Sequence, residues 1–169
     1  MKIIVAFLVG LAFFSFAGEN AHAQKRKVTI ILVRHAEKDA SDPGSNPSLS
    51  PEGRRRAERF ARLIKKYKPK RIYSTDYART RQTAAPLAEL RKLTVETYDA
   101  RRQNELAALM ASFRKGRRVV VVGHSNTIPP LANLLVGENK YENLSDSEYG
   151  KIWIIRLKKG KVRAEVLEY

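Results

Sequence analysis

Two histidines of this chain follow runs of apolar, β-branched residues. His35 comes after Val28–Val33 and Arg34, and His124 comes after Val119–Gly123. Such runs are typical of strands buried in a parallel sheet. Because open α/β sheets bind ligands at the carboxyl ends of their strands, we expect both histidines to reach one site. A histidine beside an arginine suits a nucleophilic imidazole held next to an arginine-bound phosphate.

A third polar segment follows the stretch Arg71–Ser74, which we predict to be another strand. It runs from Ser74 to Ala84 and contains Arg79. A phosphate monoester needs a cationic pocket rich in hydrogen-bond donors, because the transferring group carries charge on three oxygens. Arginine suits such a pocket better than lysine, since its planar fork binds two oxygens at once. An imidazole between arginines could attack phosphorus in line and form a phosphohistidine.

Four segments of the chain resemble, in order, the motifs of the histidine phosphatase superfamily, the group that includes phosphoglycerate mutases and acid phosphatases. The segments are Arg34-His35-Ala36, Leu49-Ser50-Pro51-Glu52-Gly53 followed by Ala57, Ser74 to Ala84, and Gly123-His124-Ser125. A single tripeptide would be weak evidence, whereas four motifs in the order of the family are strong. The resemblance runs from about residue 28 to residue 136 and points to a small, exported branch of the family.

The resemblance implies a role for each matching residue. His35 is expected to be the nucleophile that becomes phosphorylated. Arg34 and Arg79 are expected to clamp the phosphoryl oxygens, and His124 to donate to the same oxygens and stabilise charge in the transition state. Ser125 is a candidate phosphate contact, or else it satisfies backbone groups of the turn. The resemblance implies neither a metal nor an organic cofactor.

The proton donor for the leaving alcohol is open at the level of sequence. The family often places a carboxylate after the third strand, where Asp99 stands in this chain, so Asp99 is our first candidate. Glu105 is the second, although it could simply complement a helix N-terminus. Glu37, close to the nucleophile in sequence, is the third. The glutamate motif usual in the mutase branch is missing.

Composition narrows the classes of partner. The chain has 33 Lys and Arg against 17 Asp and Glu, a formal net charge of +16, and no cysteine. A field this basic attracts phosphorylated small molecules, sugars or lipid headgroups, and an anionic envelope surface. Nucleic acid is disfavoured, because no stretch alternates aromatic with basic residues. The absence of cysteine excludes disulfides and thiolate metal ligands.

The first 23 residues read as a secretory signal peptide. Met1-Lys2 gives a positive start, Ile3 to Ala17 is apolar and uncharged, and Ala21-His22-Ala23 is an A-x-A cleavage pattern. The apolar run is shorter than the ~20 residues that span a bilayer, although an uncleaved anchor is an alternative. Cleavage after Ala23 would leave His35 and His124 as the only histidines. We therefore expect a periplasmic or secreted protein whose catalytic domain spans residues 24–169.

The remaining pattern predicts an α/β fold, a three-layer αβα sandwich with a mostly parallel sheet and an antiparallel C-terminal edge hairpin. Helices should begin at three capping residues, Ser50, Asn104 and Thr127, with a further helix from about residue 77 to 91. Expected strands alternate with these helices at residues 28–33, 71–74, 94–98 and 118–122. Residues 151–157 and 162–167 flank a turn and predict the hairpin.

Three hypotheses about function follow. The first is a metal-independent phosphomonoesterase that works through a phosphohistidine at His35. The second is a non-catalytic protein that holds phosphate or polyanions on the same scaffold. The third is a phosphotransferase similar to phosphoglycerate mutase, which the short chain and the export signal disfavour. A metal hydrolase is disfavoured as well, because two histidines and no cysteine leave few ligands.

Overall fold

A six-stranded sheet organises the residues that the computed structural model describes, which are 27–113, 116–158 and 160–169. The strands are β1 (Val28–Arg34), β2 (Arg71–Ser74), β3 (Val95–Thr97), β4 (Arg118–Gly123), β5 (Lys151–Lys158) and β6 (Lys161–Glu168). The helices are α2 (Pro51–Ile64), the 3₁₀ turn η1 (Lys65–Tyr67), α3 (Ala78–Arg91), α4 (Gln103–Ser112) and α5 (Ile128–Val136). The predicted signal peptide lies outside the described residues.

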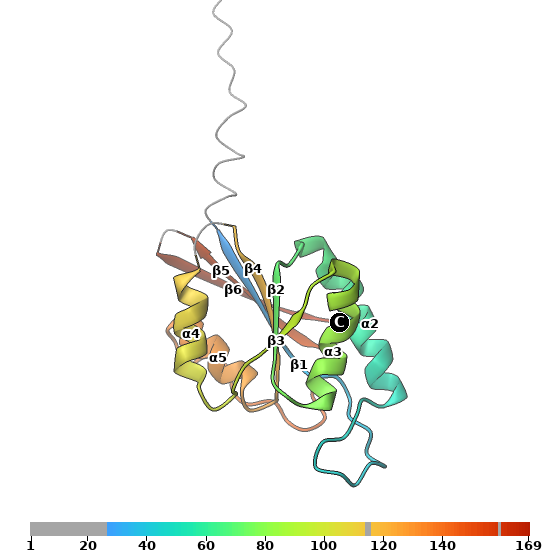
Figure 1. The fold of residues 1–169 in the computed structure, drawn as a ribbon. Helices are drawn as coiled ribbons and strands as arrows, with labels where there is room; N and C mark the ends of the chain where they lie inside the picture. The colour runs from blue at the N-terminus through green and yellow to red at the C-terminus, as the bar shows by residue number, and fades with distance from the viewer. Residues whose placement is uncertain (1–26, 114–115, 159) are drawn as a thin grey trace, which may run out of the picture.

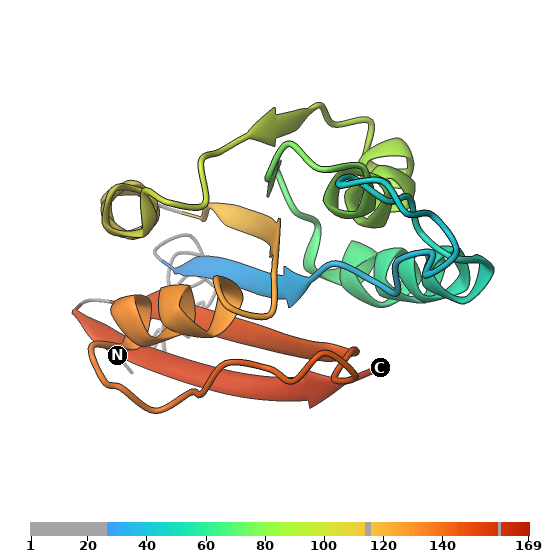
Figure 2. The same cartoon turned by 90° about the horizontal axis from the view of Figure 1, so that it is seen from below.

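The strand order is β3-β2-β4-β1-β5-β6, and its first four members run parallel. β5 is antiparallel to β1, and β6 is antiparallel to β5. Helices α2 and α3 cover one face of the sheet while α4 and α5 cover the other, as Figures 1 and 2 show. The predicted three-layer α/β architecture, with its antiparallel C-terminal hairpin, is therefore confirmed.

The central strand β1 builds both halves of the core. All seven of its residues are buried. Ile30 and Leu32 pack with α4 and α5, whereas Ile31 and Val33 pack with α2 and α3. This division follows from the two-residue period of a strand, which sends successive side chains to opposite faces. Each such side chain contributes about 1.5–3 kcal/mol by burial, so the strand that ends directly before His35 is firmly anchored in the core.

Helix α2 begins as the sequence predicts. The Ser50 hydroxyl accepts a hydrogen bond from the Gly53 backbone N–H at 3.0 Å, and Pro51 occupies the first turn. The Ser50 N–H in turn donates to the Glu37 carbonyl oxygen at 2.9 Å. Gly53 lies so close to this carbonyl that an added Cβ would be 2.1 Å from the oxygen. The start of α2 is thereby tied to the segment that follows the end of β1.

Two predicted helix caps differ in the structure. Asn104 lies inside α4, and Arg102 precedes that helix without a capping side chain. Thr127 does stand at the N-cap position of α5, but its side chain makes no capping bond to that helix. Its hydroxyl instead accepts a hydrogen bond from the His124 backbone N–H at 2.9 Å. Thr127 therefore shapes the turn that carries the second histidine. Among the described residues, no helix combines the length and apolar character needed to cross a bilayer.

Candidate active site

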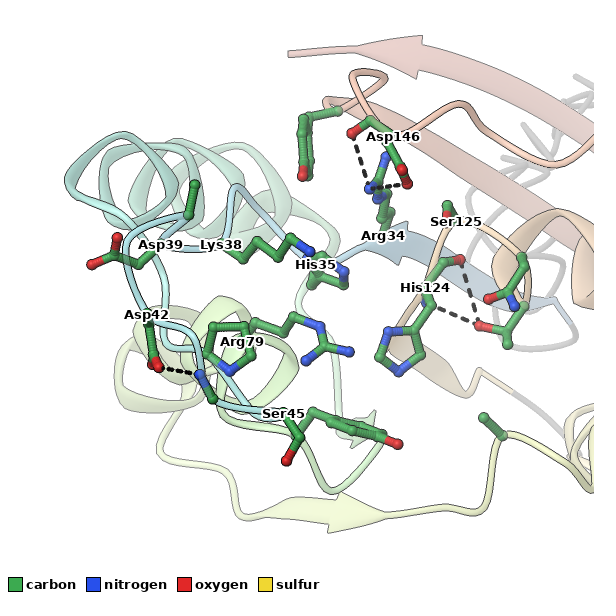
Figure 3. Close-up of a pocket in the computed structure, with 18 of the residues that line it drawn as sticks. Arg34, His35, Lys38, Asp39, Asp42, Ser45, Arg79, His124, Ser125 and Asp146 are labelled. Atoms are coloured by element: carbon green, nitrogen blue, oxygen red, sulfur yellow. Dashed lines mark hydrogen bonds and ion pairs between the residues drawn. The ribbon is translucent and has the colours of Figure 1, made fainter.

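The carboxyl ends of β1, β4 and β2 meet at one edge of the sheet. Arg34 pairs in register with Gly123, and Ser74 pairs with Val122. His35 and His124 therefore come together, with their ring centroids 5.4 Å apart and their planes at 69°. A cleft of about 1010 Å³ opens above them, as Figure 3 shows. The sequence prediction that two strand-end histidines share one site agrees with this geometry.

The cleft is lined by the side chains of several distant segments. Four of its cations are Arg34, Lys38, Arg79 and Arg101, and its carboxylates are Asp39, Asp42 and Asp146. Ser125 and both histidines also line it. The surroundings of the histidines are therefore predominantly basic, which suits an anionic ligand.

His35 is held as a neutral imidazole with one defined free nitrogen. Its Nδ1 lies 2.7 Å from the Ala36 carbonyl oxygen. Because a carbonyl only accepts hydrogen bonds, Nδ1 carries the proton and Nε2 keeps its lone pair. The side chain is 6% exposed, and burial lowers the pKa of His35 to about 3. The ring is therefore unprotonated at neutral pH, the state in which an imidazole can act as a nucleophile.

His124 is held by a chain of hydroxyl groups. Its Nε2 lies 2.9 Å from the Thr75 hydroxyl, which donates to the Thr80 hydroxyl at 3.0 Å. The Thr80 hydroxyl in turn donates to backbone carbonyls at the start of α3, those of Thr75 and Tyr77. Burial lowers the pKa of His124 to about 4, and the nearby Arg79 and Arg34 charges lower it further in the same direction. A phosphate dianion between these groups would oppose that effect and favour a protonated, donating His124.

Arg79 is the cation that the protein leaves free for a ligand. Within the described residues its guanidinium has neither a carboxylate nor a hydrogen-bond partner, and its only recorded contact is with the Tyr77 ring, 4.5 Å from the centroid. Figure 3 shows it pointing into the space beside His35 and His124. Burial, with a smaller contribution from Arg34, lowers the pKa of Arg79. An anion that pairs with this guanidinium would restore the interactions lost on burial.

Arg34 is engaged differently from what the resemblance implies. Its two terminal nitrogens donate to the backbone carbonyls of Ser145, Asp146 and Glu148 at 2.7, 3.1 and 2.7 Å. The side chain is 5% exposed, and its Nε is buried without a partner. Arg34 therefore clamps the loop before β5 with three of its five N–H groups, and Nε together with one N–H of Nη2 has no hydrogen-bond partner among the described residues.

Sequence reasoning missed two tyrosines at this site. The Tyr77 ring lies 5.1 Å from the His124 ring in an edge-to-face arrangement. The Tyr149 ring lies 4.1 Å from the Arg34 guanidinium carbon and 6.2 Å from the His35 ring. Tyr77 stands inside the segment that carries Arg79, so proximity to that motif could have indicated it. Tyr149 belongs to a stretch without periodic pattern, and no local signal marks it.

None of the three predicted proton donors lines the cleft. Asp99 is bound by the Arg101 side chain, which lowers the pKa of this carboxyl to about 2. Glu105 pairs with Arg102 at 2.7 Å. Each carboxylate is thus neutralised by a nearby arginine, a result of the basic composition. An acid that stays ionised has no proton to give, so the placement of Asp99 does not support the donor role expected for it.

The Glu37 side chain also lies outside the lining of the cleft. Its carboxylate forms a bidentate contact with the Arg56 side chain, at 2.7 and 2.9 Å from Nε, beneath the segment that follows β1. Arg56 also donates to the backbone oxygen of Tyr169, so this ion pair joins the end of β1 to the C-terminus. Glu37 is therefore better explained as a structural partner of Arg56.

The carboxylates that do line the cleft belong to loops. The loop from Lys38 to Pro47 is closed by a bridge between Lys38 and Leu49. Asp39 accepts hydrogen bonds from Ser41 and points away from His35 in Figure 3. Asp42 accepts from the Gly44 N–H. Within the part of the chain that the structure describes, no three His, Cys, Asp or Glu side chains cluster in a way that could hold a metal ion.

Comparison with known proteins agrees with this arrangement. Residues 30–103, which include the nucleophile motif, the start of α2 and the segment around Arg79, match the model of the histidine phosphatase superfamily, branch 1. Over these residues the chain is similar to this superfamily. A search of curated protein sequences finds no match. The likeness to the family therefore rests on the family model over residues 30–103 together with the order of the motifs.

Solved structures of phosphatases share the fold at low sequence identity. A mycobacterial glucosyl-3-phosphoglycerate phosphatase is 18% identical, with a TM-score of 0.67, and the match covers 85% of this histidine phosphatase-like chain and 99% of that chain. The same mycobacterial protein has been solved with inorganic phosphate and with vanadate. A phosphoserine phosphatase variant from Entamoeba histolytica, in complex with phosphoserine, is 17% identical, with a TM-score of 0.64 and coverages of 81% and 94%. These likenesses show the fold.

Proposed function

We propose that this chain is a member of the histidine phosphatase superfamily and acts as a metal-independent phosphomonoesterase with His35 as its nucleophile. One observation carries the proposal. His35 Nδ1 donates a hydrogen bond to the Ala36 carbonyl, so Nε2 keeps a free lone pair, and His35 lines a basic cleft. A ligand-free guanidinium, that of Arg79, lies in the same cleft. A neutral nucleophile beside an unpaired cation suits attack on a phosphate dianion.

Hydrolysis takes two displacements at phosphorus. In the first, Nε2 of His35 forms a bond to phosphorus while the ester P–O bond breaks, and the electron pair leaves on the alcohol oxygen, which takes a proton. In the second, water attacks phosphorus, the N–P bond breaks, and inorganic phosphate departs with the electron pair returned to Nε2. Arg79, the Nε of Arg34 and a protonated His124 stabilise the charge on the equatorial oxygens in both steps.

The substrate class follows from the cleft. Its volume of about 1010 Å³ admits a ligand much larger than phosphate itself. Its basic lining favours phosphorylated small molecules, sugars or headgroups, in line with the phosphorylated metabolites in the names of similar structures. Since none of the predicted acids lines the cleft, we expect esters of acidic alcohols, whose oxygens leave without strong proton donation, to react fastest.

The test is hydrolysis of p-nitrophenyl phosphate in the presence of EDTA, compared with His35→Ala. We expect turnover that EDTA does not affect and that disappears in the variant. Brief incubation with ³²P-labelled substrate and quenching in alkali should trap label on wild-type protein alone, because phosphohistidine survives alkali. Arg81→Ala is the matched control, since Arg81 pairs with Asp76 outside the cleft lining and should leave turnover unchanged.

A binding protein on the same scaffold is the second candidate. It is favoured by the withdrawal of Asp99, Glu105 and Glu37 from the cleft and by the net charge of +16. This candidate predicts salt-dependent affinity for lipopolysaccharide that persists in His35→Ala, together with no turnover of any monoester. Alkali-stable label on His35 would eliminate it.

Export is part of the proposal. The A-x-A pattern that ends at Ala23 supports cleavage before Gln24. Expressed in a bacterium with a periplasm, the chain should be recovered from the periplasmic or secreted fraction with Gln24 as its N-terminal residue. Intact Met1 in protein from the membrane fraction would indicate an anchor instead.

A further inference from the structure

Strand β6 is an exposed edge of the sheet. It pairs with β5 and is the last strand in the order β3-β2-β4-β1-β5-β6. Seven of its eight residues are exposed, among them Val162 at 40% and Val166 at 41%. A long edge strand with exposed valines presents unpaired backbone groups to other chains, which is why proteins commonly cover or charge such edges.

The free backbone groups of this edge belong to alternate residues. The Tyr169 N–H donates to the Gly150 carbonyl across the β5–β6 ladder. Because the N–H and C=O of one residue point to the same side of a strand and alternate along it, the odd-numbered residues of β6 face β5. The N–H and C=O groups of Val162, Ala164 and Val166 therefore point outward, and none of them has a hydrogen-bond partner among the described residues.

A second copy of the chain fits this edge in one register. A two-fold axis perpendicular to the sheet at Ala164 would pair the two β6 strands antiparallel. Val162 would then lie opposite Val166 of the other copy, Arg163 opposite Glu165, and Ala164 opposite itself. An axis at Arg163 or at Glu165 would instead place two arginines or two glutamates directly opposite, which is destabilising. The outward N–H and C=O groups of the even-numbered residues match the first register.

The charges around Arg163 favour the same partner. Arg156, Lys158 and Arg163 lie close enough to Lys27 that, after burial, their charges lower the pKa of Lys27. Glu165 is 2.7 Å from Arg156, and Arg163 has no ion pair within the described residues. In the paired register, Glu165 of the second copy supplies the carboxylate that Arg163 lacks.

The apolar side chains of β6 lie on the same face of the sheet as buried apolar side chains of β5. Val162, Ala164 and Val166 stand opposite Leu157, Ile155 and Trp153 of β5, residues on the α4–α5 side of the core. Cross-strand valine pairs would extend this apolar stripe into the second copy. The cleft is separated from this edge by β1 and β5, so both clefts would stay open.

We propose that two copies of this chain associate through β6, forming a continuous antiparallel sheet about a two-fold axis at Ala164. The occupant of the edge is thus a second copy, because an antiparallel β6 brings Glu165 opposite Arg163 and Val166 opposite Val162. This proposal does not depend on the phosphatase activity.

Sedimentation equilibrium of the full chain over the micromolar range tests the proposal. We expect a reversible increase to twice the mass of the chain. Ala164→Pro should abolish it, because proline removes an outward N–H while the β5 ladder, which uses the odd-numbered residues, stays intact. Circular dichroism and thermal unfolding establish whether Ala164→Pro is folded. A monomer at every concentration, or a dimer unchanged by a folded Ala164→Pro, would overturn the proposal.

Charge variants give an independent test that does not rely on proline. Arg163→Glu places glutamates opposite each other and should weaken association about tenfold or more, and Glu165→Arg should do the same with arginines. The double exchange Arg163→Glu with Glu165→Arg restores opposite charges and should recover association. Equal losses in the single and double variants would contradict the register.

Discussion

At the scale of the residue, the two arginines of the cleft perform different tasks although the motifs make them look alike. Arg34 donates hydrogen bonds from its terminal nitrogens to three backbone carbonyls of the loop before β5. Arg79 makes no such bond within the described residues and contacts the Tyr77 ring. A buried donor that satisfies carbonyls contributes to folding, whereas an unpaired guanidinium contributes to ligand binding.

Substituting each arginine by methionine should separate these tasks. Arg34→Met removes the three hydrogen bonds that a buried side chain makes to the loop before β5 and should lower the free energy of unfolding by about 3 kcal/mol. Arg79→Met should leave that free energy nearly unchanged but weaken phosphate binding roughly tenfold to hundredfold, the value of a charge-assisted hydrogen bond. Urea denaturation and phosphate titration calorimetry measure the two effects. Equal destabilisation by both variants would show that the distinction is wrong.

At the scale of the element, the start of α2 supports the nucleophile segment. Glu37, two residues after His35, gives its carbonyl to the Ser50 N–H and its carboxylate to Arg56 on α2. Gly53 permits the close approach that these contacts need. The helix thus fixes the backbone on which the His35 ring depends.

Gly53→Ala tests this packing because helix propensity and sterics predict opposite signs. Propensity alone predicts stabilisation by about 1 kcal/mol. The added Cβ would meet the Glu37 carbonyl oxygen at 2.1 Å, so we expect destabilisation by about 1–3 kcal/mol. Arg62→Ala on the exposed side of the same helix is the control and should change stability by less than about 0.5 kcal/mol. A Gly53→Ala variant as stable as wild type would mean that the helix can shift freely.

At the scale of the whole molecule, the buried histidines make stability depend on pH. Burial lowers the pKa of His35 to about 3 and that of His124 to about 4, whereas an unfolded histidine titrates near ~6.5. Between these values the unfolded chain binds protons that the folded chain does not. Stability is therefore complete above the unfolded pKa and is lost as pH falls below it.

Urea denaturation in phosphate-free buffer at pH 7, 6 and 5 should show this loss. Each histidine that stays neutral only in the fold lowers the folded-to-unfolded ratio by up to about tenfold per pH unit. His35→Gln removes one such group, so its stability should fall less steeply with pH than that of wild type. Hydrogen bonds lower the pKa values of Asp99 and Glu148 to about 2. The stability that these two carboxylates contribute to the fold is therefore lost only as pH falls through the ordinary carboxylate range and below it. If the free energy of unfolding fell with pH equally steeply in wild type and His35→Gln, the result would contradict a neutral His35 in the fold.

The local pattern of the sequence was sufficient to predict the fold and the position of His35 directly after β1. Apolar runs such as Val28–Val33 predict buried strands, and Ser50 predicts a helix start, because strand period and capping act over a few residues. The meeting of His35 and His124 follows from these elements once the strands are parallel, since parallel strands end at one edge of the sheet. These expectations agree with the structure because each depends on short-range rules.

Tertiary structure alone decided which charged groups are free. Arg34 finds the Ser145 carbonyl 111 positions along the chain, and Glu37 finds Arg56, while Asp99 is neutralised by Arg101. In a chain with about twice as many cations as carboxylates, each acid has several possible arginines, and sequence spacing does not choose among them. The choice is made by distance in the folded state, because Coulomb attraction and hydrogen bonds act through space rather than along the chain. The meeting of His35 and His124 could therefore be predicted from sequence, whereas the arginine partners of the candidate proton donors could not.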